Sequence, residues 1–185
     1  MLTDEVIRSA RRSLLFRARS IRNAEFNNAI EHQFTAEHIR NGLAAQGLAP
    51  WLARSLGDDI NRPALYSLSV DDAETAEAIM NAFDALPAEQ ERGYRLPRRN
   101  PGREAQTTLY VGGSESIRQR LQQHIGSAPV GTYALNMQRW CPEFDGVVTV
   151  RVQSFSPEVN RDCRQDLEDT LWDSLQPIFG KRGAR

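Results

Sequence analysis

Residues 107–126 read TTLYVGGSESIRQRLQQHIG, and this stretch decides the fold because it places a short strand directly before a helix. Tyr110 stands between two apolar residues, an alternation typical of a strand with one buried face. The pair Gly112 and Gly113 predicts a tight backbone turn, because glycine adopts conformations that other residues avoid. A serine after the glycines can then cap the helix that follows.

That helix has two distinct faces. Its apolar residues recur every four positions, which predicts a buried stripe made of Ile117, Leu121 and Ile125. Arg120 and His124 are also four apart, so they share a second face beside the stripe. The unit therefore brings a tyrosine, an arginine and a histidine to one side.

The flanking sequence predicts the remainder of an α/β (α+β) fold. Alternating or β-branched residues indicate strands at 63–70, 131–137 and 147–155. Helical periodicity and capping residues indicate helices at 73–86 and 160–175. We expect a small central sheet, mixed or antiparallel, flanked by helices.

The first 62 residues read as an all-helical unit. Apolar residues fall at helical spacing along residues 3–23, the spacing continues at positions 26, 30 and 34, and Thr35 can cap a further helix. We therefore expect a helical N-terminal unit at 1–62 and a second domain at 63–185. An insertion at about 71–106 would separate two paired strands of that second domain.

Two arginine-rich segments are candidate nucleic-acid contacts. We expect the helix at residues 3–23 to pack its apolar side inward, and the opposite side carries a stripe of arginines: Arg8, Arg12, Arg19 and Arg22. Arg98 and Arg99 lie at 88–106, a polar stretch without apolar periodicity, which indicates a loop. Guanidinium groups suit phosphate contacts, but a solvated outer face is the commoner meaning of such a stripe. Contact of the N-terminal helices with a protein partner is the third alternative.

The ordered set of these residues resembles the GIY-YIG nuclease superfamily. Tyr110-Val111-Gly112 matches the second motif of that family, and Ala64-Leu65-Tyr66 stands in the place of the first motif, keeping only its tyrosine. Arg120 and His124 follow at the family's order and spacing. Downstream, Glu168 resembles the metal-binding glutamate, whereas Gly180 stands about where members usually carry an asparagine.

The resemblance, which spans about residues 63–183, implies a metal-dependent endonuclease that hydrolyses phosphodiester bonds. Glu168 would bind Mg²⁺ or Mn²⁺, since carboxylate oxygens suit hard cations. Tyr66 or Tyr110 would help to activate the attacking water, Arg120 would neutralise developing charge, and His124 would orient a tyrosine or a water. The substrate is expected to be DNA, with RNA as the open alternative.

Each of these residues also has an ordinary structural interpretation. The tyrosines can pack in strands, Arg120 can be a solvated arginine, His124 a buried histidine, and Glu168 a partner of a nearby arginine. The altered first motif and Gly180 motivate an alternative function, namely a nucleic-acid-binding or adaptor subunit that keeps the fold without cutting.

Composition sets further limits. The net charge of −1 means that no global positive field marks a nucleic-acid binder, although only Lys181 among the 23 basic residues is a lysine. Cys141 and Cys163 are too far apart for a CxxC metal motif. The sequence has no apolar run of membrane length, and we expect a cytoplasmic protein with no membrane partner.

Overall fold

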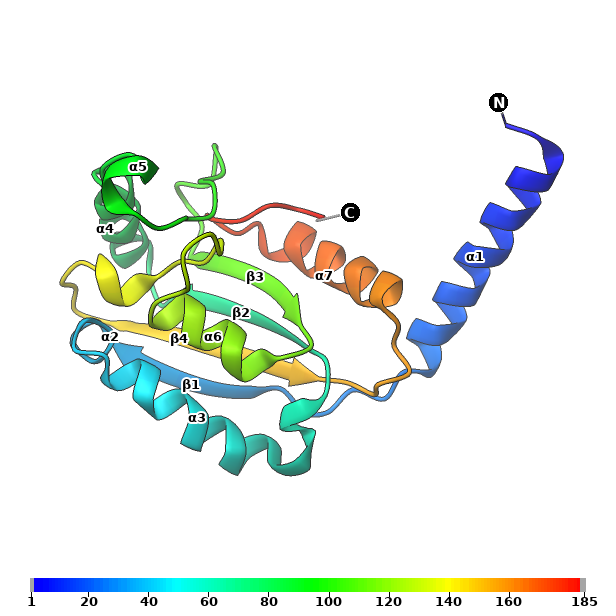
Figure 1. The fold of residues 1–185 in the computed structure, drawn as a ribbon, viewed down its shortest axis with the longest axis horizontal. Helices are drawn as coiled ribbons and strands as arrows, with labels where there is room; N and C mark the ends of the chain where they lie inside the picture. Colours follow the sequence, from blue (N-terminus) through cyan, green and yellow to red (C-terminus); the bar gives the residue numbers. More distant parts are fainter. Residues whose placement is uncertain (1, 184–185) are drawn as a thin grey trace.

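The computed structural model describes residues 2–183 and confirms the α/β class. A four-stranded antiparallel sheet in the order β1-β4-β2-β3 is flanked by helices (Figure 1). The strands are β1 (Ile30–Thr35), β2 (Ala64–Val70), β3 (Thr108–Ser114) and β4 (Val147–Ser154). The α-helices are α1 (Asp4–Asn23), α2 (Ala36–Arg40), α3 (Leu43–Leu56), α4 (Ala73–Asp84), α5 (Glu89–Arg92), α6 (Ile117–Ile125) and α7 (Arg161–Leu175). Two 3₁₀ turns, η1 (Gly57–Asn61) and η2 (Met137–Arg139), complete the order.

Several helices begin at residues whose side chains accept a hydrogen bond from a backbone N–H that has no partner within the helix. Thr35 caps α2 as predicted, Asp72 caps α4, and Asn160 caps α7. The start of each of these helices is therefore encoded locally in the sequence.

The two tyrosine strands pair directly across the 71–106 segment, as expected. In the antiparallel β2–β3 ladder, Tyr66 lies opposite Gly112 and Leu65 opposite Gly113. The predicted tight turn at the two glycines is wrong, because both lie inside β3. Their role, described below, is to leave space for side chains on either side of the strand.

The expectation of an all-helical unit at 1–62 is wrong for residues 30–35. These residues form β1, which pairs with β4 and joins the same sheet as the second half of the chain. Phe26, Ile30 and Phe34 are four residues apart, and an even spacing puts residues on one side of a strand as well as of a helix. The spacing alone could not distinguish the two structures.

The strand predicted at 131–137 is also absent. Leu135 and Met137 are buried, but Tyr133 is 54% exposed, so the alternation does not describe one face. Asn136 adopts a left-handed conformation with φ of 52°, which interrupts an extended chain. Its side chain accepts from the N–H of Ala128 and donates to the carbonyls of Arg95 and Ala134, and these bonds replace strand pairing.

The predicted loop at 88–106 contains the short helix α5 and then packs along the C-terminal segment. The N–H groups of Ile178 and Phe179 donate to β3 at the carbonyls of Thr108 and Leu109. Asn100 contacts the same C-terminal segment. Its backbone N–H donates to the carbonyl of Ile178, and its side-chain Nδ2 donates to the carbonyl of Pro177. The start of β3 is therefore covered on its outer edge by hydrogen-bonded chain.

Helix α1 contacts the body only through its C-terminal part and extends away from it (Figure 1). Arg17 forms an ion pair with Asp166 of α7 at 3.2 Å, and Ile21 packs beside Phe155 and Cys163. We expected the apolar side of this helix to pack inward, but none of its residues is buried. Within residues 2–183, no helix is long and apolar enough to cross a membrane.

Candidate active site

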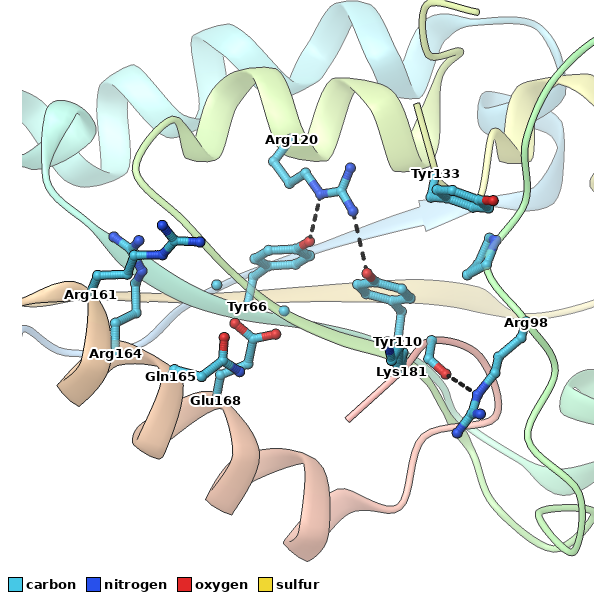
Figure 2. A pocket seen from close by; sticks show the side chains of 14 residues that line it. Tyr66, Arg98, Tyr110, Arg120, Tyr133, Arg161, Arg164, Gln165, Glu168 and Lys181 are labelled. Carbon is cyan, nitrogen blue, oxygen red and sulfur yellow. Dashed lines mark hydrogen bonds between the residues drawn. The ribbon is translucent and has the colours of Figure 1, made fainter. Parts of the chain in front are cut away.

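The four main candidate residues converge on one pocket of about 680 Å³. Tyr66 comes from β2, Tyr110 from β3, Arg120 from α6 and Glu168 from α7 (Figure 2). Segments more than 100 residues apart in the sequence thus meet beside the β2–β3 pair. The structure brings these four side chains together.

Gly112 and Gly113 allow this convergence because they leave both sides of β3 open. A Cβ atom on Gly112 would lie 2.5 Å from the Tyr66 hydroxyl, and one on Gly113 would lie 2.7 Å from Oε2 of Glu168. Both distances are far below van der Waals contact. Neighbouring residues of a strand point to opposite faces, so the two glycines make room for the tyrosine on the α6 side and the glutamate on the α7 side.

Arg120 is held in place by three hydrogen bonds. Its Nε donates to the hydroxyl of Tyr66 at 3.2 Å and its Nη2 donates to the hydroxyl of Tyr110 at 3.3 Å. Its Nη1 donates to Oε1 of Gln123 at 3.0 Å. A guanidinium has five N–H groups, so two remain to bind an oxyanion in the pocket.

His124 is completely buried behind Tyr66. Its Nδ1 accepts the backbone N–H of Leu135 at 3.2 Å, and its Nε2 lies 3.0 Å from the Tyr66 hydroxyl. Burial, aided by the nearby charge of Arg120, lowers the pKa of His124 well below its usual value, so the ring is neutral. Because Nδ1 is an acceptor, the proton is on Nε2 and is donated to Tyr66.

The hydroxyl oxygen of Tyr66 thus accepts two hydrogen bonds, from Arg120 and from His124. Burial raises the pKa of Tyr66 well above its ordinary value, with a further contribution from Tyr110. The phenol therefore keeps its proton, and both of its acceptor positions are filled. Its remaining capacity is to donate that proton in a hydrogen bond.

Glu168 is a half-buried carboxylate without an ion pair to any described basic side chain. Burial, and next the charge of Asp169, raises its pKa to about 7, although the backbone N–H of Gly113 and the charges of Arg164 and Arg120 act in the opposite direction. Within residues 2–183, no group of three or more His, Cys, Asp or Glu side chains could hold a metal ion. Any cation here would have Glu168 as its protein ligand, with other ligands supplied by solvent or substrate.

The pocket is strongly basic although the whole chain is nearly neutral. Its lining contains five basic side chains and one carboxylate, Glu168; the basic ones are Arg98, Arg120, Arg161, Arg164 and Lys181. The sequence analysis missed Arg161, Arg164 and Lys181 as site residues. Helical spacing could have indicated Arg164, which lies four residues before Glu168 on α7, whereas only the tertiary structure places Lys181 here.

The other arginines predicted to contact nucleic acid differ in their position relative to the pocket. Arg98 lines the pocket and donates to the side chain of Asn100 at 3.1 Å. Arg99 does not line it, and instead pairs with Asp84 of α4 at 2.5 Å. The four α1 arginines, Arg8, Arg12, Arg19 and Arg22, are exposed and also do not line this pocket.

The local structure explains why position 180 is a glycine. Its φ of +109° disfavours any residue with a side chain, and a Cβ there would lie 3.1 Å from the ring of Tyr110. The backbone of Gly180 is also tied to Arg98, because its N–H donates to the Arg98 carbonyl at 3.0 Å. An asparagine at this position would require Tyr110 to move.

Comparisons of the chain with protein-family models, with curated proteins and with solved structures found no match.

Proposed function

We propose that this protein is a divalent-metal-dependent endonuclease of the GIY-YIG type that hydrolyses phosphodiester bonds, with DNA as substrate. One observation carries the proposal: two tyrosines, Arg120 and Glu168 meet in a pocket where five basic side chains surround a single carboxylate. A phosphodiester is an anion, and a basic concave site on an otherwise neutral molecule favours its binding.

Arg120 would bind a non-bridging oxygen of the scissile phosphate. Its two unused N–H groups are available for this, and the tyrosine hydroxyls hold its guanidinium in one orientation. A donor fixed in advance stabilises the charge that develops in the transition state without reorganisation.

Tyr66 would donate a hydrogen bond to the phosphate or to the attacking water, because its own acceptor positions are filled. His124 would keep the hydroxyl of Tyr66 oriented and would not itself exchange a proton. Of the two tyrosines, Tyr110 is the more exposed, and its hydroxyl has only the Arg120 bond, so it is the better placed to contact the water.

Glu168 fits Mg²⁺ or Mn²⁺, because it is a desolvated hard-oxygen ligand that lacks a cation within ion-pair distance. When bound, a divalent cation would polarise the phosphate and stabilise the leaving oxygen. The single carboxylate is consistent with Mg²⁺, which keeps several waters and shares its site with phosphates. We place the activity in the cytoplasm, where the two buried free thiols, Cys141 and Cys163, would stay reduced.

The test is cleavage of single-stranded, double-stranded and branched DNA in the presence and absence of Mg²⁺ or Mn²⁺. We expect cleavage that stops with a chelator and that Glu168→Gln lowers at least about 100-fold. Glu158→Gln, the same chemical change at an exposed position outside the pocket, should leave the rate unchanged. Full activity in excess chelator would contradict the metal-dependent mechanism.

A second candidate is a non-catalytic nucleic-acid-binding or adaptor subunit that keeps this fold. It is favoured by Gly180, which gives the pocket no side chain where members of that family usually carry an asparagine, and by Ala64-Leu65 in the altered first motif. DNA binding with no cleavage under any metal condition would select this alternative.

A further inference from the structure

Arg161 and Arg164 lie side by side at one end of the candidate active site. Figure 2 shows them on the opposite side of Glu168 from Arg98, so the pocket has separate basic groups at its two ends. Arg161 and Arg164 are the first and fourth residues of α7. Positive charge at the start of a helix is unfavourable, because it meets the positive end of the helix dipole. The stability of α7 therefore does not explain this pair.

Arg164 is fixed close to Glu168. Its side chain is only 14% exposed. A Cβ atom on Gly113 would lie 2.7 Å from Oε2 of Glu168 and 3.5 Å from Cδ of Arg164, so both side chains approach the same face of β3. The two residues are one helical turn apart, or about 6 Å along the axis of α7. An anion bound by Arg164 would therefore lie within one nucleotide's reach of Glu168.

The charges of Arg161 and Arg164 are only partly balanced within residues 2–183. Nη1 of Arg164 donates to Oε1 of Glu115 at 2.9 Å, whereas Arg161 forms no ion pair with a described carboxylate. Glu115 is 71% exposed, and an ion pair with an exposed partner is weak. A phosphate is a better ligand here, because its oxygens can accept hydrogen bonds from both guanidinium groups at once.

We propose that Arg161 and Arg164 bind the phosphate next to the scissile one, and that this phosphate displaces Glu115 from Arg164. The inference rests on the proposed nuclease function, in which the scissile phosphate lies between Arg120 and Glu168. A second phosphate contact fixes the position of the strand, so that a single phosphodiester bond is presented to the catalytic groups. Glu115 keeps Arg164 paired while no DNA is bound.

The first test measures binding of a short fluorescein-labelled DNA duplex, and of its single strand, by anisotropy in chelator so that no cleavage occurs. Arg164→Gln should weaken binding about 10-fold and lower the slope of log affinity against log salt by about one unit. Glu115→Gln should instead strengthen binding about 3-fold, because the phosphate no longer competes with the carboxylate. Unfolding cannot strengthen binding, so this result separates a phosphate site from a structural ion pair.

A double variant tests whether Glu115 acts through Arg164. In the Arg164→Gln background, Glu115→Gln should have no effect on binding. Glu143→Gln is the matched control, since it breaks the exposed Arg40–Glu143 pair outside the pocket and changes the net charge equally, and it should leave binding unchanged. Weaker binding by Glu115→Gln, an equal gain in both backgrounds, or an equal gain from Glu143→Gln would overturn the proposal.

The second test locates the phosphate. A neutral methylphosphonate replaces the phosphates of the same DNA one at a time, again in chelator. One position should weaken binding of the natural sequence about 10-fold and have little further effect on Arg164→Gln. With Mg²⁺ restored, cleavage of the unmodified DNA should fall at the phosphodiester bond adjacent to that position. An equal loss in both proteins at every position, or a coupled position remote from the cut, would overturn the proposal.

The phosphate site and the nuclease function fail in different ways. Coupling between one phosphate and Arg164, without cleavage under any metal condition, would contradict the nuclease function and retain the phosphate site. Cleavage that occurs while neither Arg164→Gln nor Glu115→Gln alters DNA binding would contradict the phosphate site alone. Absence of DNA binding would overturn both.

Discussion

At the scale of single residues, the Gly112-Gly113 pair is the feature that the sequence shows most clearly and whose role is easiest to misread. Two adjacent glycines usually indicate a turn, yet here they continue a strand. Their role is steric, since Tyr66 occupies the space on one side and Glu168 the space on the other. Glycine in a strand commonly marks such a close approach.

This steric role can be tested by adding one methyl group. Gly112→Ala should destabilise the fold by about 1–3 kcal/mol, because the new Cβ would lie 2.5 Å from a buried hydroxyl that cannot move freely. Gly47→Ala in α3, where the nearest side-chain atom is 4.0 Å away, should instead be neutral or stabilising. The measurement is urea unfolding; equal stability of the two variants would contradict the steric explanation.

The raised pKa of Glu168 predicts that the stability of the fold decreases as the pH rises. Its pKa is about 7 in the folded protein against 4.5 for an unperturbed glutamate, so the folded state binds the proton more tightly. Stability is therefore lost as the pH rises from 4.5 through 7, and the cost persists above that range. Glu168→Gln removes the ionised form and should stabilise the protein at pH 8, but not at pH 4, by on the order of 1 kcal/mol after solvent screening is allowed for.

The check is urea unfolding in chelator at both pH values, with Glu158→Gln as control. A constant difference between Glu168→Gln and the natural sequence at pH 4 and pH 8 would mean that the carboxylate has an ordinary pKa.

At the scale of elements, α1 has an apolar side and an arginine side. Arg8, Arg12, Arg19 and Arg22 lie opposite its apolar residues and are exposed. The arginine side is therefore accessible to DNA and can be tested by itself.

If the arginine side contacts phosphates, replacing Arg12 and Arg19 with glutamine should weaken DNA binding uniformly across sequences. The slope of log affinity against log salt should fall by about one unit for each lost contact. Folding should survive, with a change below about 0.5 kcal/mol, because both side chains are exposed. Arg54→Gln on α3 is the matched control for Arg12→Gln, since it changes the net charge equally. An unchanged salt slope would show that this side of α1 is a solvated surface.

At the scale of the whole molecule, positive charge is concentrated in one pocket although the net charge of the chain is close to zero. The chain has a net charge of −1, yet the candidate site is lined by five basic side chains. Arginines on α6 and α7 supply three of them, Arg98 comes from the 88–106 loop, and Lys181 comes from the C-terminal segment. Composition alone could not reveal this concentration of charge, because it arises when distant segments meet.

A bound cation should stabilise the whole fold. A ligand that binds only the native state at about 100 times its dissociation constant adds about 2.7 kcal/mol, so Mg²⁺ or Mn²⁺ should raise the thermal midpoint of the natural sequence. Glu168→Gln should abolish that shift, and Glu158→Gln should keep it. A midpoint that responds to Mg²⁺ equally in all three proteins would place the cation elsewhere.

The sequence by itself determined the α/β class, the strand–helix order around residues 107–126 and the cap at Thr35, because local spacing and capping chemistry act within a few residues. Tyr66, Tyr110, Arg120 and Glu168 became candidates through their resemblance to the ordered motifs of the GIY-YIG family. Only the tertiary structure decided that residues 30–35 form a strand, since even spacing fits helix and strand alike and β4 supplies the partner. It also decided that the glycines continue β3 and that Arg161, Arg164 and Lys181 join the pocket. These depend on which distant segments pack together, and no local pattern encodes that contact.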